Sequence, residues 1–334
     1  MSTANQPRVT ENENIVTVDN LKIHFPLKGG ETVKAVDGVS FQIRAGETLG
    51  IIGESGSGKS TVGRALVGLL KPTEGTLRYG ETDISELSAA EYKRLRKNYQ
   101  IIFQDPHAAL NPRMTILQSL VEPMEIQKEG TRESRRKTAL AALERAGLAP
   151  EIALRYPHEL SGGQKQRINI ARALTVHPRF IVCDEVVAAL DVSVRGSILN
   201  LFADLQDELG LTYAFITHDI SVVAHVSQRV GVMYLGNMME LGPTGAVIDQ
   251  PLHPYTQALL SAEPRPVPSD MREDRRIRLE GEIPSPVAPP SGCRFRTRCP
   301  FATEKCAAEP PEWREIVPDH WVACHYATPE GQVA

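Results

Sequence analysis

The chain has no long hydrophobic run, although 41% of its 334 residues are hydrophobic. No apolar stretch approaches the ~18 residues that a membrane-spanning helix needs. Residues 1–14 are largely polar and carry no apolar signal core, so we expect them to form a short disordered lead-in. These absences predict a protein that stays in the cytoplasm and reaches a membrane only through a partner.

An excess of positive charge is also missing. Lys and Arg number 37 against 41 Asp and Glu, which gives a net charge of −4. This balance argues against non-specific binding to nucleic acid. The sequence contains no internal repeat and no low-complexity tract, and its length allows one large domain or one domain with an appendage.

Short β-rich runs alternate with helical patterns over roughly the first 245 residues, which predicts an α/β domain. The expected strands are Val39–Ile43, Thr48–Ile52, Gln100–Phe103, Phe180–Cys183 and Thr212–Thr217, and the expected helices are Lys59–Leu69, Glu133–Ala146, Gln164–Leu174 and Val192–Leu209. The composition changes after about Ala262. Twelve of the 24 prolines and both tryptophans lie between Glu263 and the C-terminus, so we expect few regular elements there.

A phosphate-binding loop follows the expected strand Thr48–Ile52. It consists of Gly53, Glu54, Ser55, Gly56, Ser57, Gly58, Lys59, Ser60 and Thr61, which match the pattern G-x-x-x-x-G-K-[ST]. The glycines let backbone N–H groups point at a phosphate, and the helix that begins near Lys59 adds a favourable dipole. We expect Lys59 to reach the β- and γ-phosphates and Ser60 to bind Mg²⁺. The loop is typical of kinases, GTPases, motors and transporter ATPases alike.

Two further motifs distinguish among these classes of phosphate-loop protein. Leu160-Ser161-Gly162-Gly163-Gln164 precedes a hydrophobic run that ends in Asp184 and Glu185. Ser161 is a good N-cap, and two glycines at a helix N-terminus make a second anion-binding surface. This pattern resembles the ABC ATPase family. The resemblance implies a mixed sheet with helices, an inserted helical subdomain, and head-to-tail pairing in which Ser161, Gly162, Gly163 and Gln164 close over the ATP held by another subunit.

The same resemblance implies roles for polar residues at strand ends. Asp184 would hold Mg²⁺ through its water shell, and Glu185 would polarise the attacking water as general base. Gln104 matches the family's Q-loop, which contacts metal or water, and His218 matches the switch histidine that contacts the γ-phosphate. Taken singly, such residues are more often structural, so these roles depend on the resemblance.

Other matches to the family are less specific. Asp191 belongs to a segment that resembles the D-loop, which helps to join the two nucleotide sites. Phe25 matches an aromatic that stacks on adenine, and packing at a sheet edge explains it almost as well. Val186 and Ala188 stand where the family usually has proline and serine. Valine frees φ and restores an N–H, which predicts slower hydrolysis or the weaker site of a pair.

The segment His253–Leu260 is similar to the one that opens the C-terminal extension of dipeptide/oligopeptide (and nickel) importer ATPases. The likeness continues through Gly281–Pro286 and Gly292–Cys293, and the pattern as a whole is most similar to the second ATPase subunits of dipeptide permeases. It implies an ABC ATPase domain at residues 15–250, with a helical subdomain at about 105–160, and an irregular extension at 251–334.

Four cysteines are concentrated in this extension: Cys293, Cys299, Cys306 and Cys324. A short proline-rich segment has little apolar core and usually needs a metal or another staple. Four thiolates suit zinc or a [4Fe–4S] cluster. Zinc sites favour closer cysteine pairs, and the resemblance points to iron–sulfur, so we expect [4Fe–4S], with zinc or free thiols as alternatives. We expect His320 and His325 on the surface and Cys183 in the core.

The leading hypothesis is an ATP-hydrolysing subunit of a di- or oligopeptide importer. The implied partners are a second, related ATPase subunit, two membrane permease subunits and an extracytoplasmic peptide-binding protein, with this chain bound peripherally at the cytoplasmic face of a bacterial inner membrane. The alternatives are the same role for nickel or another solute, an ABC ATPase that acts on nucleic acid or ribosomes, and an iron–sulfur regulator with a vestigial ATPase. The single ATPase domain and negative charge disfavour the second, and the intact Lys59, Asp184, Glu185 and His218 disfavour the third.

Overall fold

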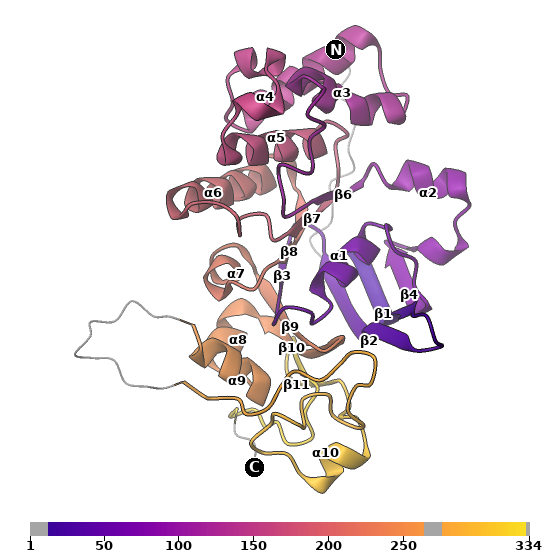
Figure 1. Cartoon of the computed structure of the whole chain (residues 1–334), viewed down its shortest axis with the longest axis vertical. Coiled ribbons are helices and arrows are strands. Elements are labelled where there is room, and N and C mark those ends of the chain that lie inside the picture. The colour runs from indigo at the N-terminus through magenta and orange to yellow at the C-terminus, as the bar shows by residue number, and fades with distance from the viewer. Residues whose placement is uncertain (1–12, 264–275, 332–334) are drawn as a thin grey trace, which may run out of the picture.

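The structure, a computed structural model, describes residues 13–263 and 276–331 (Figure 1). A helical layer lies at one end of an elongated molecule, two sheets lie in the middle, and the C-terminal segment forms the other end. Most of the expected disordered lead-in falls outside the described residues, and Asn14 already begins the first strand.

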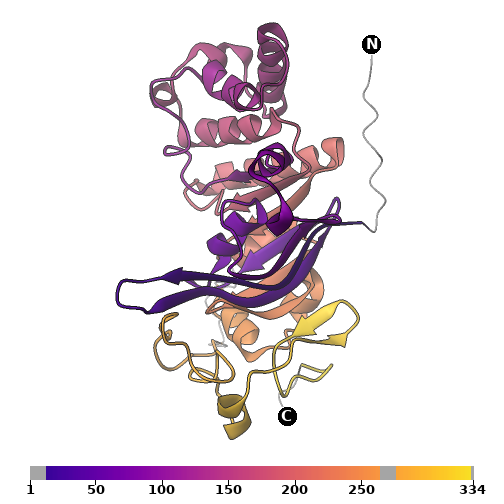
Figure 2. The ribbon, with the colours of Figure 1, turned by 90° about the vertical axis from the view of Figure 1, so that its right-hand side faces the viewer.

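The smaller sheet has four antiparallel strands in the order β2-β1-β4-β5. They are β1 (Asn14–Pro26), β2 (Thr32–Arg44), β4 (Glu74–Tyr79) and β5 (Thr82–Asp83). Strands β1 and β2 form a long hairpin whose tip extends from the body (Figure 2). Val16 and Val18, and then Leu21 and Ile23, are buried on one face, and the period breaks where the pairing with β2 shifts register.

The larger sheet has eight strands in the order β11-β12-β10-β9-β3-β8-β7-β6. They are β3 (Thr48–Ile52), β6 (Tyr99–Ile102), β7 (Phe180–Asp184), β8 (Thr212–Ile216), β9 (Arg229–Tyr234), β10 (Asn237–Pro243), β11 (Arg314–Val317) and β12 (His320–Val322). The neighbouring strands β9, β3, β8, β7 and β6 run parallel to one another. Strand β10 pairs antiparallel with β9, and β12 and β11 continue this edge with antiparallel pairings. Every residue of β3, β7 and β8 is buried, as parallel strands covered on both faces require. The mixed sheet predicted from the sequence is confirmed.

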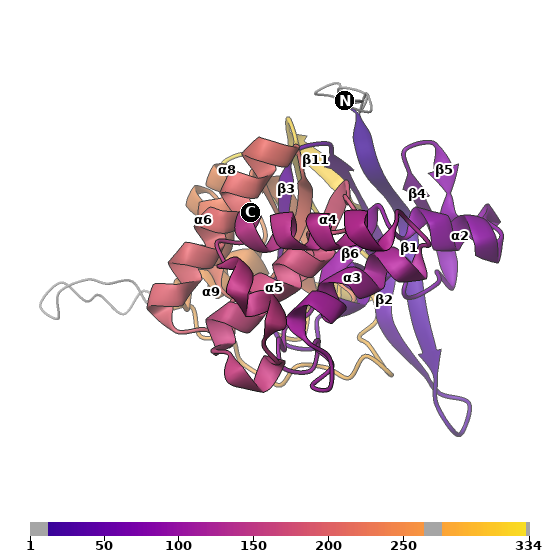
Figure 3. The ribbon, with the colours of Figure 1, turned by 90° about the horizontal axis from the view of Figure 1, so that it is seen from above.

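Helices cover both sheets and form a separate layer beyond them. They are α1 (Lys59–Leu66), α2 (Ala89–Leu95), α3 (Ile116–Ile126), α4 (Arg132–Arg145), α5 (Gly162–Leu174), α6 (Val192–Leu209), α7 (Ile220–Val226), α8 (Thr244–Asp249), α9 (Pro254–Ser261) and α10 (Glu304–Ala308), with short 3₁₀ turns at Ile84–Glu86, Pro150–Leu154 and Pro157–Glu159. Helices α3, α4 and α5 pack together as the layer in front of the sheet in Figure 3. Helices α3 and α5 each begin with a capping box, Thr115 with Gln118 and Ser161 with Gln164.

The predicted strands and helices are confirmed, with differences at their ends. Strand β2 is longer than Val39–Ile43 because it pairs with β1 along the whole hairpin. Helix α1 stops at Leu66, short of the predicted Leu69, because Gly68 takes a positive φ of 68° and closes the helix. No helix in the described ranges combines the length and the apolar character needed to cross a bilayer.

The C-terminal segment is joined to the larger sheet. Strand β12 pairs with β10 at the sheet edge, and β11 pairs with β12. Its regular elements are short, as its proline content predicts. The surface position predicted for His320 is wrong: its side chain is 2% exposed, and its Nε2 lies 2.7 Å from Oε1 of the buried Glu240 in β10. The pairing of β12 with β10 causes this burial.

Candidate active site

The candidate catalytic residues follow the carboxyl ends of adjacent parallel strands. The phosphate loop follows β3, His218 follows β8, Asp184 ends β7, and Gln104 follows β6. Because these strands are neighbours in the order β3-β8-β7-β6, all four segments meet at one edge of the sheet.

Two glycines let the phosphate loop lie against other backbone segments. Gly53 has φ 150° and Gly58 has φ 102°, and a Cβ at these positions would lie 2.1 Å from the carbonyl oxygen of Met233 and 2.3 Å from that of Ala35. No larger residue fits either place without movement of the backbone. The remaining predicted loop residues complete the same turn and the start of α1: Ser55, Gly56, Ser57 and Thr61.

Lys59 is buried, and its side chain folds back on the loop. Its Nζ donates hydrogen bonds to the carbonyl oxygens of Gly53 at 2.8 Å and Glu54 at 2.9 Å. Burial lowers the pKa of the ammonium, and the carboxylates of Glu185, Asp184 and Glu54 oppose this shift. Lys59 therefore lies close to the two acids at the end of β7, Asp184 and Glu185.

Ser60 and Asp184 are already in contact. The Ser60 hydroxyl donates to Oδ1 of Asp184 over 2.9 Å. Burial raises the pKa of Asp184, and the hydrogen bond from Ser60 partly offsets this effect. Hydroxyl and carboxylate oxygens are ligands that Mg²⁺ accepts, so the pair fits the predicted metal contact in chemical type.

Glu185 joins two other predicted catalytic residues. Its Oε2 accepts a hydrogen bond from Nε2 of Gln104 at 2.8 Å, and its Oε1 lies 3.3 Å from Nδ1 of His218. Its backbone has a φ of 50°, in the left-handed region that residues with a side chain rarely adopt. Such local strain is concentrated at functional sites. Val186 at the next position is 3% exposed and belongs to the core beneath the site.

The remaining predicted contacts are not joined to this cluster. Ser161 is exposed at the N-terminus of α5, where its hydroxyl accepts a hydrogen bond from the N–H of Gln164. Asp191 is the exposed N-cap of α6. Phe25 lies near the tip of the β1–β2 hairpin with 38% of its surface exposed. In the described chain, each is placed on the surface, where another molecule can reach it.

Two contacts to the phosphate loop were not predicted from the sequence. The hydroxyl of Tyr255 in α9 accepts a hydrogen bond from the N–H of Glu54 at 2.9 Å. The guanidinium of Arg298 donates to both carboxylate oxygens of Glu54, at 2.8 and 3.2 Å. These partners lie 201 and 244 residues from Glu54, and no local sequence signal connects them.

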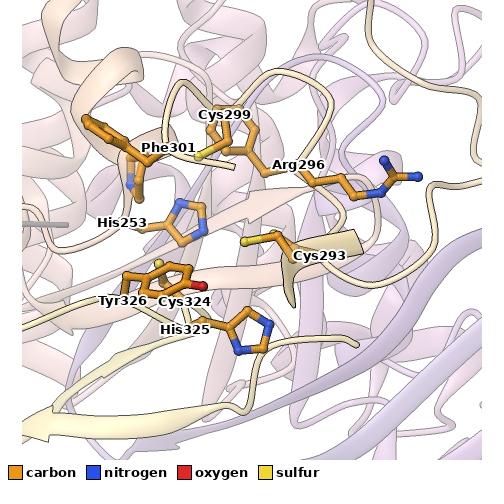
Figure 4. Close-up of a pocket in the computed structure, with 11 residues that line it drawn as sticks. His253, Cys293, Arg296, Cys299, Phe301, Cys324, His325 and Tyr326 are labelled. Atoms are coloured by element: carbon orange, nitrogen blue, oxygen red, sulfur yellow. The ribbon is translucent and has the colours of Figure 1, made fainter. Parts of the chain in front are cut away.

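The four C-terminal cysteines line one small cavity of about 20 Å³. Figure 4 shows Cys293, Cys299 and Cys324 reaching it from separate segments, beside His253 and Tyr326. Among residues 13–263 and 276–331, however, no three His, Cys, Asp or Glu side chains are grouped closely enough to hold a metal ion. The predicted metal site is therefore not confirmed as a formed site.

Three of the cysteines in this cavity have a raised thiol pKa. Burial raises the pKa of Cys293 and of Cys299 to about 11, and it also raises the pKa of Cys324. The neighbouring cysteines add to each shift, which is consistent with their common cavity. Cys183 is fully buried in β7, as predicted.

Known families match most of the chain. The ABC transporter family matches residues 36–188, and the family described as "Oligopeptide/dipeptide transporter, C-terminal region" matches residues 239–306. The putative oligopeptide transport ATP-binding protein YkfD of Bacillus subtilis is 53% identical over 93% of this chain and 95% of its own. The oligopeptide transport ATP-binding protein AppF of the same organism is 51% identical over 97% and 99%.

Solved structures lead to the same family. A dimeric post-hydrolysis structure of the ATP-binding cassette MJ0796, bound to ADP and Pi, is 33% identical, with a TM-score of 0.63 over 69% of this chain and 98% of that one. CbiO1 from Clostridium perfringens is 30% identical, with a TM-score of 0.64 over 72% and 92%. The chain therefore belongs to the ABC transporter family, as an ATP-hydrolysing ATP-binding protein with an oligopeptide/dipeptide transporter C-terminal region.

Proposed function

We propose that this chain hydrolyses ATP to drive the import of di- or oligopeptides through a separate membrane permease. The observation that carries the catalytic part is the hydrogen-bonded set of Gln104, Glu185 and His218 beside the phosphate loop. The peptide part is supported by relatives that are named oligopeptide transport ATP-binding proteins and that match 93% and 97% of this chain.

The phosphate loop would bind the β- and γ-phosphates through its backbone N–H groups and Lys59. For this, the Lys59 ammonium exchanges its two carbonyl partners for phosphate oxygens, which its position within the loop allows. Ser60 and Asp184 would hold Mg²⁺, which neutralises phosphate charge when it is bound.

Glu185 would act as general base. A water attacks the γ-phosphorus, its proton moves to the Glu185 carboxylate, and the bond between the γ-phosphorus and the bridging oxygen of ADP breaks. The amide of Gln104 fixes one carboxylate oxygen, which leaves the other to orient the water with His218. Both neighbours therefore position the base and the water.

A second subunit would complete the site. Ser161, Gly162, Gly163 and Gln164 lie at the N-terminus of α5, where Ser161 is exposed, so they can close over ATP held by a partner. Asp191 would contribute at the same interface, and Phe25 would stack on the adenine. We favour a related ATPase chain as this partner, with two permease subunits, an extracytoplasmic peptide-binding protein, and a peripheral position at the cytoplasmic face of the inner membrane.

The domain limits remain part of this proposal. We assign the ATPase domain to residues 15–250, with its helical subdomain at about 105–160, and the extension to 251–334. Helix α5, which begins at the Ser161–Gln164 motif, packs on α3 and α4, so the helical layer continues past residue 160.

The Glu185→Gln variant tests the catalytic assignment. Glutamine keeps the shape and the contact with Gln104 but cannot accept the proton, so we expect turnover in the assembled complex to fall about 10²–10⁴-fold. Protein recovered after incubation with MgATP should then contain ATP, where the wild type contains ADP. Unchanged turnover would remove Glu185 from this role.

We also propose that the four cysteines hold a metal centre that staples the extension, a [4Fe–4S] cluster in the first instance and zinc in the second. Support comes from the donor chemistry, because four thiols line one cavity. Because the pKa of the Cys293 and Cys299 thiols is raised, metal loading would release protons. The sulfurs would also have to move closer together, because the described side chains are not grouped closely enough to hold a metal ion.

Metal analysis of anaerobically purified protein tests this centre. We expect iron and acid-labile sulfide in the wild type, and loss of both in Cys299→Ser. Cys183→Ala is the matched control, because this cysteine is buried in β7 away from the cavity. One zinc per chain would instead establish the alternative, and no metal in any preparation would contradict both.

A further inference from the structure

Glu54 is the residue of the phosphate loop with the most extensive polar contacts. Its carbonyl oxygen accepts hydrogen bonds from Lys59 Nζ at 2.9 Å and from the N–H of Ser57 at 3.2 Å. Its N–H donates to Tyr255, and its carboxylate is bound by Arg298. Glu54 thus contacts Lys59 through its carbonyl oxygen, and it contacts the C-terminal part of the chain through its N–H and its carboxylate.

The contact with Arg298 has the geometry of a strong ion pair. Both carboxylate oxygens of Glu54 are engaged, at 2.8 and 3.2 Å, by the two terminal nitrogens of the guanidinium. The Arg298 side chain is only 9% exposed, and its guanidinium lies over the ring of Tyr234, 5.8 Å from the centroid. Water therefore competes weakly for this pair, in contrast to an ordinary surface ion pair.

Arg298 is held in place by the extension before any nucleotide arrives. Its N–H donates to the carbonyl oxygen of Phe295 over 3.0 Å. Phe295 is fully buried, and its ring packs against Tyr234 and Tyr255 with centroids 5.4 and 5.3 Å away. The residue after Arg298 is Cys299, which lines the cysteine cavity. A rigid turn thus presents the guanidinium to the loop.

We propose that Arg298 is a positioning residue for nucleotide binding, which acts through Glu54 to fix the backbone of the phosphate loop that receives the β- and γ-phosphates. The C-terminal extension would then contribute directly to ATP affinity. This inference rests on the proposed role of the phosphate loop, and it predicts an effect on ATP affinity rather than on the bond-breaking step, which belongs to Glu185.

The test compares four variants in the full-length protein: Arg298→Gln, Arg298→Lys, Glu54→Gln and the reversed pair Glu54→Arg with Arg298→Glu. Loss of the ion pair should weaken binding of a fluorescent ATP analogue and raise KM about 10-fold, with kcat changed less than about 2-fold. Arg298→Lys keeps the charge without the two-point contact and should lose less. The reversed pair should recover part of the affinity that Arg298→Gln loses.

Asp319→Asn is the matched control. Asp319 also forms an ion pair between the extension and the ATPase core, with Arg44 at 2.6 Å, but the two side chains are 52% and 40% exposed. Arg44 ends β2, whereas the phosphate loop lies against Ala35 near the start of that strand. Asparagine tolerates the positive φ of 61° at this position. We expect wild-type ATP affinity in this variant. Thermal unfolding of every variant shows whether the extension stays folded.

The outcomes separate this inference from the proposed function. Wild-type protein that fails to bind the analogue would overturn both. Tight wild-type binding with unchanged affinity in Arg298→Gln and Glu54→Gln would overturn the positioning role alone. Equal losses in Asp319→Asn and Arg298→Gln would also overturn it, because any weakening of the extension would then suffice.

Discussion

At the scale of single residues, the phosphate loop contains two glycines with similar backbones and different surroundings. Gly56 has φ 79°, and a Cβ added there would meet no atom within 4 Å, whereas a Cβ at Gly58 would meet the carbonyl oxygen of Ala35 at 2.3 Å. Alanine is strained by the positive φ at both positions, but only at Gly58 does it also collide with backbone.

We therefore expect Gly58→Ala to weaken ATP binding more than Gly56→Ala. The shared φ penalty is about 1 kcal/mol, and the collision at Gly58 adds movement of the loop on top of it. Isothermal titration of both variants with MgATP measures the difference. Equal affinities would show that the close approach to Ala35 does not shape the loop.

The residue types at the site were predictable, and several of their partners were not. The acids after Phe180–Cys183 and the histidine after Thr212–Thr217 follow from strand-end motifs, and the structure places His218 3.3 Å from Glu185. The contact of Lys59 with two loop carbonyls depends on where the backbone turns, which the motif does not encode. His320 was misplaced because its burial comes from a strand pairing between distant segments.

At the scale of elements, the N-terminus of α5 has a structural role and a proposed functional role. Ser161 caps the helix through Gln164, and the same end would bind a phosphate held by the partner subunit. A variant that keeps the cap but changes the charge can separate these two roles.

Ser161→Asp is that variant. Aspartate caps helices as well as serine does, so we expect the thermal midpoint to stay within about 2 °C of the wild type. Its carboxylate would repel the γ-phosphate, so ATP hydrolysis by the assembled pair of ATPase subunits should fall at least about 10-fold. Full activity at an unchanged midpoint would mean that this helix end does not contact nucleotide.

Element positions followed from the sequence where local rules decide them. Gly210 has φ 64° and ends α6 at Leu209, where the pattern placed the end. The length of β2 could not be read in this way, because the partner strand β1 determines it.

At the scale of the whole molecule, the extension is joined to the ATPase core by three kinds of contact. Strand β12 continues the larger sheet, Arg298 binds the phosphate loop, and Arg294 forms an ion pair with Asp37 in β2. Arg294 and Arg298 stand directly beside Cys293 and Cys299 in the sequence. Composition alone marked this segment as a separate, irregular appendage, because ion pairs across 257 and 244 residues and a pairing of non-consecutive strands leave no local pattern.

Uptake of labelled peptide tests the central claim most directly. The complete complex, with permease, both ATPase subunits and binding protein, would be placed in vesicles with ATP on the ATPase side and a mixture of labelled di- and oligopeptides on the other. We expect peptide to cross only with ATP, and Lys59→Ala to reduce the rate at least about 10²-fold, because the phosphates lose their main cation. Transport that persists without ATP or with Lys59→Ala, or a wild-type complex that moves no peptide, would contradict the account.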